Sequence, residues 1–138
     1  MELYLDHEKE HLYVTLGIAC FPEEDWVEVV DATLERWVPA LTSFLTGHTD
    51  QCLLEFMDGP FEVRLLRKEE TIIARFFQEG REAGPDHIPN QARLYHSLMR
   101  VIRQCRRIDH RNGKTPRFDR EITVLQQEKP KRQGDYHV

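Results

Sequence analysis

Three apolar-rich runs separated by two short polar breaks occupy the middle of the chain. The runs cover residues 52–57, 61–67 and 71–77, and the breaks cover 58–60 and 68–70. The first break reads Asp-Gly-Pro, in which Gly permits a positive φ and Pro presets its own φ near a turn value. The second break has the length of an ordinary hairpin connection. Short connections join antiparallel neighbours, so the pattern predicts a three-stranded meander.

A period-two pattern also marks the N-terminal region. Residues 2–5 alternate between apolar and polar, and residues 6–10 are a charged break. Apolar residues then recur at every second position, at Leu12, Val14, Leu16 and Ile18. One apolar face with this period is typical of a half-buried strand. The pattern therefore predicts a hairpin of strands 2–5 and 11–20.

A helical pattern follows the hairpin. The acidic residues after Pro22 lie where a helix dipole favours negative charge, and Gly47 is a suitable C-terminal stop. Between them, apolar residues follow spacings of three and four: Val27, Val30, Leu34, Trp37, Leu41 and Phe44. Pro39 lies within this pattern and predicts either a kink or a second helix after Val38.

Four carboxylates share a narrow arc of this predicted helix, beside its apolar stripe: Glu24, Glu28, Asp31 and Glu35. Like charges at these spacings repel, whereas a solvated helix face gains from pairing Glu with Lys. Trp26 lies at the far edge of the apolar arc, where an exposed indole suits an interface. We therefore expect these five residues to bind a basic protein. The alternative is an ordinary solvated helix face.

A second helix is predicted after the loop 79–90, which contains two Gly and two Pro. Asn90 is a suitable N-cap, and Asn112-Gly113 suits the C-terminal end. The apolar stripe consists of Leu94, Leu98, Val101, Cys105 and Ile108. An opposite arc of about 80° carries five arginines: Arg93, Arg100, Arg103, Arg107 and Arg111. Because arginine neutralises phosphates, this arc supports an alternative function as a nucleic-acid-binding accessory protein.

The order of the predicted elements is β-β-α-β-β-β-α, with residues 121–126 as a further edge strand. This order predicts an α+β fold, with one antiparallel sheet of five to six strands and two amphipathic helices packed on one face. Residues 1–126 form a single domain on size grounds, and residues 127–138 form a polar, flexible tail. The outer face of strand 71–77 is more apolar than a solvated sheet requires, which leaves a homodimer open.

The net charge of −5 for the 138 residues conceals an uneven distribution. Residues 1–70 carry −11 (16 acidic and 5 basic residues), and residues 71–138 carry +6 (8 acidic and 14 basic residues). This division predicts two surfaces of opposite sign. The three cysteines, Cys20, Cys52 and Cys105, are odd in number and lie in apolar runs, which favours free thiols and a cytoplasmic location. No apolar run approaches the ~18 residues that span a bilayer, so we expect no membrane partner.

Motifs for catalysis or metal binding are weak. His7 and His11 flank a charged turn, but no CxxC or HExxH motif accompanies them. Ser97 adjoins His96, but neighbouring side chains on a helix point in different directions. We expect no catalytic residues, no metal and no other cofactor. An enzyme that uses His7, His11 or an acidic pair remains the alternative.

The layout of residues 1–111, with the strand–turn–strand segment 56–65 and its Asp58-Gly59-Pro60 turn, resembles a known class of proteins. It looks like the small bacterial immunity proteins of polymorphic-toxin and contact-dependent-inhibition systems. The resemblance implies a cytosolic, non-enzymatic chain that binds one cognate toxin and blocks it. Many such toxins are basic nucleases, which an acidic surface would suit by electrostatic steering.

Overall fold

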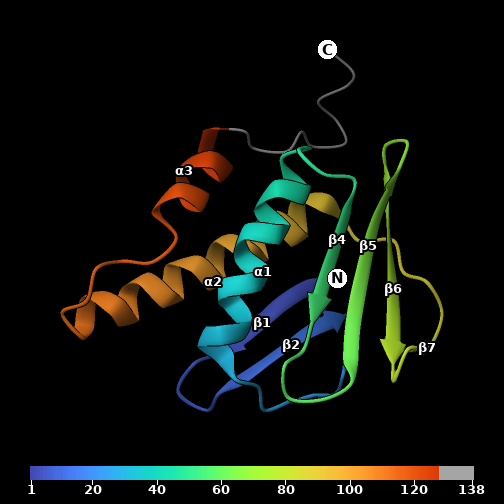
Figure 1. The fold of residues 1–138 in the computed structure, drawn as a ribbon, viewed down its shortest axis with the longest axis horizontal. Coiled ribbons are helices and arrows are strands. Elements are labelled where there is room, and N and C mark those ends of the chain that lie inside the picture. The colour runs from blue at the N-terminus through green and yellow to red at the C-terminus, as the bar shows by residue number, and fades with distance from the viewer. Residues whose placement is uncertain (128–138) are drawn as a thin grey trace.

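The computed structural model describes residues 1–127 and has an α+β fold of two antiparallel sheets and three helices (Figure 1). The N-terminal sheet contains β1 (Glu2–Asp6), β2 (His11–Leu16) and β3 (Ala19–Phe21). The second sheet contains β4 (Gln51–Glu55), β5 (Phe61–Lys68), β6 (Thr71–Gln78) and β7 (Arg81–Glu82). The helices are α1 (Val30–Leu45), α2 (Gln91–Arg111) and α3 (Asp119–Gln127). The predicted tail lies outside the described residues, except for Gln127 at the end of α3.

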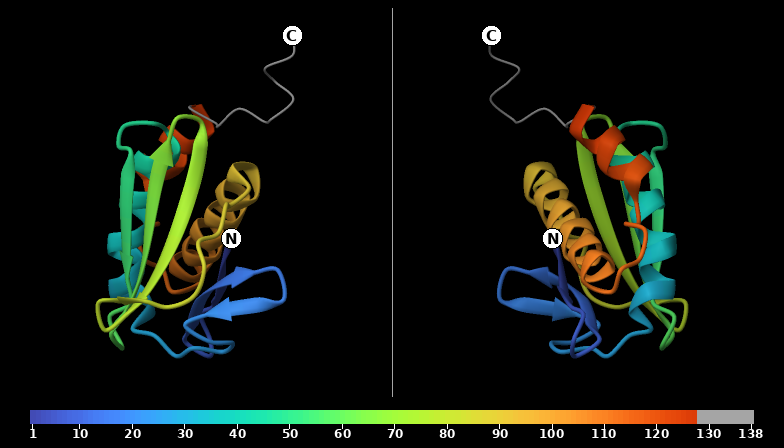
Figure 2. Two further views of the ribbon diagram at one scale, coloured as in Figure 1. Left: turned by 90° about the vertical axis from the view of Figure 1, so that its right-hand side faces the viewer. Right: turned by 90° about the vertical axis from the view of Figure 1, so that its left-hand side faces the viewer.

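The α+β class is confirmed, but the prediction of one sheet with five to six strands is wrong. The two sheets meet through side chains: Phe21 of β3 packs against Phe76 of β6, with ring centroids 5.1 Å apart. Each sheet has its own helix, because α2 packs on β1 and α1 packs on β4. Figure 2 shows the two sheets as separate units, with α2 beside the N-terminal one. The alternation of apolar and polar residues identifies the buried face of each strand, but it does not show which strands pair with one another.

The N-terminal sheet has one more turn than expected. The hairpin of β1 and β2 is present, with Leu3 opposite Val14 and Leu5 opposite Leu12. The predicted long strand 11–20 is divided, because Gly17 has a φ of 71° and reverses the chain into β3. This left-handed conformation is accessible to Gly without a steric penalty.

The meander of β4, β5 and β6 is confirmed, and β7 extends it at one edge. The connection between β5 and β6 is one residue shorter than predicted, because Lys68 pairs with Thr71. On the outer face, the Arg64 guanidinium lies 4.0 Å from the ring centroid of Phe77 and covers it. Leu53 remains 46% exposed on the neighbouring strand.

The helices differ from the predictions at three places. Helix α1 begins at Val30 rather than directly after Pro22, and it continues through Pro39 without a break. Helix α2 agrees closely with its prediction, because the Asn90 side chain accepts a hydrogen bond from the backbone N–H of Arg93 at 3.0 Å. Residues 121–126 belong to α3 and are not an edge strand. Within residues 1–127, the helices lack the combination of length and hydrophobicity that crossing a bilayer requires.

Candidate functional site

Glu28 is a buried carboxylate that holds separate segments of the chain together. Glu28 is only 2% exposed. Oε1 accepts hydrogen bonds from Trp26 Nε1 at 3.0 Å and from the Asp58 backbone N–H at 3.1 Å. Oε2 accepts from the Met57 backbone N–H at 2.7 Å and from the Thr33 hydroxyl. The segment before α1 is thereby fastened to the loop between β4 and β5.

This segment before α1 is extended, which decides the direction of its side chains. Val27 forms an antiparallel bridge with His11, and the Glu28 backbone N–H donates to the Glu10 carbonyl at 2.9 Å. Successive side chains of an extended chain point to opposite sides. Glu28 is turned inward, whereas Val27 and Val29 are 50% and 51% exposed.

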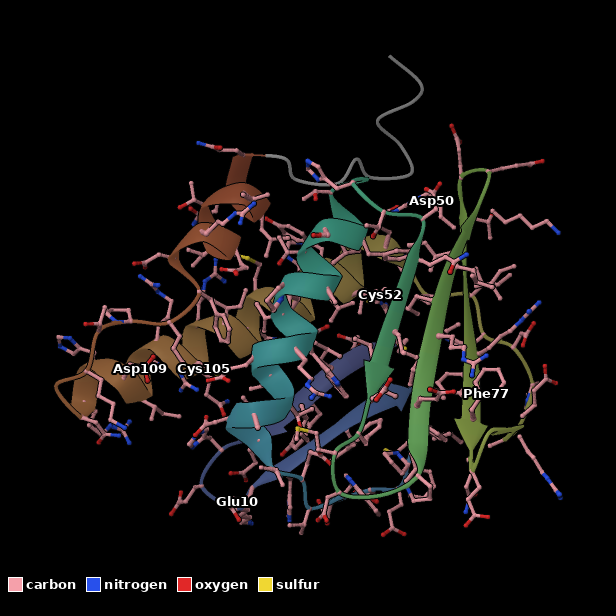
Figure 3. The ribbon with its side chains drawn as sticks, viewed as in Figure 1. Glu10, Asp50, Cys52, Phe77, Cys105 and Asp109 are labelled. Carbon is pink, nitrogen blue, oxygen red and sulfur yellow. The ribbon has the colours of Figure 1, made fainter. Side chains whose placement is uncertain are left out.

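Exposed apolar side chains and exposed carboxylates occur in the segments that meet at one end of the molecule. Met57, whose backbone contacts Glu28, is 44% exposed like the two valines. Figure 1 shows that the β1–β2 turn, the connection into α1 and the β4–β5 loop share this end, and Figure 3 labels Glu10 there. We call this surface the acidic end; it comprises Val27, Val29, Met57, Glu10, Glu23, Glu24, Glu55 and Asp58. Among residues 1–127, these carboxylates form no ion pair.

The predicted helical ridge of carboxylates is wrong as a surface. Glu24 and Glu28 precede the first residue of α1, so helical spacing does not apply to them. Glu24 is exposed at the acidic end, and Glu28 is buried. Asp31 and Glu35 are exposed on α1, but Asp31 is neutralised within the molecule by Arg117, whose Nη1 donates to its Oδ1 at 2.6 Å.

Trp26 is oriented inward rather than presented as an exposed anchor. Its indole is half-buried and packs edge-on against Phe61, with ring centroids 5.1 Å apart. A Cβ placed on Gly59 would lie 3.0 Å from Trp26 Cζ2, so this close approach requires glycine. Gly59 has a φ of 153°, which side-chain-bearing residues also rarely adopt. Trp26 therefore shapes the loop beneath the acidic end.

A second charged cluster joins α2 to the segment that precedes α3. Asp109 is buried at 4% exposure and accepts hydrogen bonds from the Arg117 backbone N–H at 3.0 Å and from Arg117 Nε at 2.9 Å. Burial raises the pKa of Asp109, but the hydrogen bonds from Arg117 outweigh it and hold that pKa below its ordinary value. The pKa of Asp31 is lowered for the same reasons, with His7 as a further partner at 3.1 Å. This cluster ties α1, α2 and the segment before α3 together.

Two cavities flank this cluster and share His7. One, of about 370 Å³, lies beside β1 and is lined by Asp6, Glu8, Arg107 and Arg111 among others. The other, of about 260 Å³, is lined by Asp31 and Arg117 among others. Each cavity combines side chains of both charge signs, so neither favours a ligand with one sign of charge.

The arginines predicted to line one face of the second helix are all exposed on α2. Arg100 pairs with Glu2, whose Oε1 lies 3.1 Å from the Arg100 Nη2. The other four, Arg93, Arg103, Arg107 and Arg111, form no ion pair among the residues that the structure describes.

Cys52 and Cys105 are buried, and His7 and His11 contact different carboxylates. Burial raises the pKa of the Cys52 thiol to about 12 and that of Cys105 to about 11, so neither is a ready nucleophile at neutral pH. His7 Nε2 lies 3.1 Å from Asp31 Oδ1, whereas His11 Nδ1 lies 3.6 Å from Asp25 Oδ1. No group of three or more potential metal ligands occurs in the described part of the chain.

Comparisons of the chain with models of protein families, with curated proteins and with solved structures found no match. The likeness to immunity proteins therefore remains a hypothesis from sequence. The described residues offer two candidate binding surfaces, the acidic end and the arginine-bearing face of α2.

Proposed function

We propose that this chain is a non-enzymatic binding protein that captures a basic protein through its acidic end. The observation that carries the proposal is the exposure of three apolar residues, Val27, Val29 and Met57, in the same segments as exposed carboxylates that form no ion pair within residues 1–127. An interface draws most of its affinity from a few apolar anchors, and charges at its rim steer the partner and set the rate of association. The acidic end offers both apolar residues that can serve as anchors and charged residues that can serve as a rim.

The more specific form of the proposal is toxin immunity. It rests on the sequence resemblance together with the sign of the acidic end, which suits a basic nuclease-type toxin. Glu28 supports this role indirectly, since it fixes the two loops that present Val29 and Met57. Fixed loops lose little conformational entropy on binding.

The test pairs the purified chain with the C-terminal region of the protein encoded by the gene immediately upstream. We expect tight binding, measured by stopped-flow and surface plasmon resonance. Glu24→Lys with Asp58→Lys should lower the association rate about tenfold at 50 mM salt and change the dissociation rate little. Val27→Ser with Val29→Ser should instead accelerate dissociation, because the apolar anchors are removed.

The matched control is Glu69→Lys with Glu70→Lys, which makes the same change in charge on the exposed β5–β6 turn. This turn lies at the opposite end of the second sheet from the β4–β5 loop (Figure 1). Equal losses in the two charge-reversed variants would mean that net charge alone acts. No binding of the upstream product would contradict the immunity proposal.

A further inference from the structure

Helix α2 presents a face with a single sign of charge along its whole length. All of its exposed residues are arginine or histidine: Arg93, His96, Arg100, Arg103, Arg107, His110 and Arg111. The 21 residues of α2 extend about 30 Å at 1.5 Å per residue. Acidic residues are abundant elsewhere in the described chain, yet only Glu2 forms an ion pair with this face. An ordinary solvated helix face mixes both signs and gains from their pairing.

The chemistry of this face distinguishes between classes of partner. The anchors at the centre of a protein interface are enriched in Trp and Tyr as well as Arg, and the exposed residues of α2 include no Trp, Tyr, Phe or aliphatic side chain. Single-stranded nucleic acid is held largely by stacking of bases on aromatic rings, but Tyr95, the aromatic residue of α2, is buried at 5% exposure. A row of guanidinium groups without anchors fits the phosphates of a duplex, where counterion release drives binding.

We propose that the exposed face of α2 binds the phosphate backbone of double-stranded nucleic acid, independently of base sequence. Phosphates of one strand lie about 3.4 Å apart along the duplex axis, so about 30 Å of helix faces about nine base pairs. Arg103, Arg107 and Arg111 recur every four residues on one side of the helix, about 6 Å apart along its axis. This surface shares no residue with the acidic end, although Arg107 and Arg111 line a cavity together with Asp6 and Glu8. The proposal for α2 therefore does not depend on the proposal for the acidic end.

The test measures fluorescence anisotropy of labelled 20-base-pair duplexes of mixed sequence, one of DNA and one of RNA, with the single strand as a third probe. We expect a dissociation constant of about 10⁻⁵ M for the duplexes at 50 mM salt. The four arginines that form no ion pair within residues 1–127 predict a log–log salt slope of about −3.6, and therefore a loss of about 150-fold between 50 and 200 mM salt. Comparing the two duplexes distinguishes DNA from RNA as the source of the phosphates.

The decisive variant is Arg103→Gln with Arg107→Gln and Arg111→Gln. It should reduce the magnitude of the salt slope to about 1 and weaken binding at 50 mM salt at least twentyfold. Its matched control, Lys68→Gln with Arg81→Gln and Arg120→Gln, removes the same charge from exposed positions outside α2 and should bind within twofold of the wild type. Circular dichroism checks that both variants fold.

Three results would overturn the proposal. The first is no binding of either duplex at 50 mM salt, and the second is an equal loss in the two triple variants, which would mark a net-charge effect. The third is tighter binding of the single strand, or of poly-glutamate as an acidic polypeptide, than of the duplexes.

Discussion

A single side chain, Glu28, connects the segment before α1 with the β4–β5 loop. Two of its donors are the backbone N–H groups of Met57 and Asp58 in the β4–β5 loop. A buried donor that loses its acceptor costs about 1–3 kcal/mol, and hydrogen bonds to charged groups are the stronger ones. The carboxylate is therefore central to the order of this loop.

We predict that Glu28→Gln lowers the free energy of unfolding by about 2–4 kcal/mol. The amide keeps one acceptor oxygen but places an NH₂ group against N–H donors, which leaves donors unsatisfied. Urea denaturation measures the change. Glu24→Gln, an exposed carboxylate four residues earlier, should stay within about 0.5 kcal/mol of the wild type. A similarly small effect for Glu28→Gln would show that the four hydrogen bonds contribute little.

The predicted exposure of Glu28 on a helix is wrong because helical spacing applies only from the residue where the helix begins. Glu28 lies seven residues before Glu35 and so shares its helical arc, but α1 starts two residues later, at Val30. Its backbone partners, Met57 and Asp58, are 29 and 30 residues away, which local pattern cannot reveal. A signal was present, since Val27, Val29 and Val30 are β-branched and favour extended chain over helix.

At the scale of elements, the segment from residue 112 to α3 shows how a short helix is held in place. Arg117 extends between α2 and α1 by pairing with Asp109 and Asp31. Leu125 of α3 is fully buried, and its carbonyl accepts a hydrogen bond from the Tyr95 hydroxyl at 2.9 Å. The ion pairs of Arg117 and the burial of Leu125 together hold α3 against the other two helices.

We predict that Asp109→Asn destabilises the fold by about 2–4 kcal/mol at pH 7, because it leaves Arg117 partly buried without its main partner. The folded pKa of Asp109 lies below the unfolded value of about 3.9. Its contribution is therefore complete above about pH 4 and is lost as the pH falls through the folded pKa. Urea denaturation from pH 6 to pH 2 should show the difference between wild type and variant shrinking on acidification.

The control for this prediction is Asp119→Asn. The Asp119 side chain is 70% exposed and pairs with Arg106, so its loss should change stability by less than about 1 kcal/mol. A difference between wild type and Asp109→Asn that stays constant with pH would mean that the Asp109–Arg117 pair does not carry the effect.

Elements with strong local signals were predictable, and those that depend on distant contacts were not. The meander of β4 to β6 follows from alternation and short turns, and the start of α2 follows from the Asn90 cap. The alternation of Ile122 and Val124 predicts a strand, but it covers too short a run to decide, and these residues are helical. The helical state of α3 brings Leu125 to the contact with Tyr95, which is 30 residues away. The exposure of the arginines on α2 agrees with the prediction, because the helix that carries them begins and ends close to where the sequence predicts.

At the scale of the whole molecule, the two surfaces proposed for binding differ in the sign of their charge. Carboxylates gather at the acidic end, and guanidinium groups gather on the exposed face of α2. Each surface repels itself, and the ion pairs that would relieve this repulsion are mostly absent among residues 1–127. Surfaces that reduce stability without a structural benefit are expected where binding is the function.

If the arginine face exists for binding, one substitution on it should raise the stability of the fold and weaken duplex binding. Arg103→Glu replaces a repulsive pair with an attractive one toward Arg107 at i+4, in the favourable order with Glu nearer the N-terminus. It should also relieve repulsion with Arg100 and Arg106 at three residues' distance. We expect the free energy of unfolding to rise by about 0.5–1 kcal/mol at low salt, while duplex binding weakens at least fivefold. Arg103→Gln, which removes the charge without reversing it, should give about half of the stability gain. If Arg103→Glu instead lowers stability, the arginine face contributes to the fold, and its charge needs no binding partner to account for it.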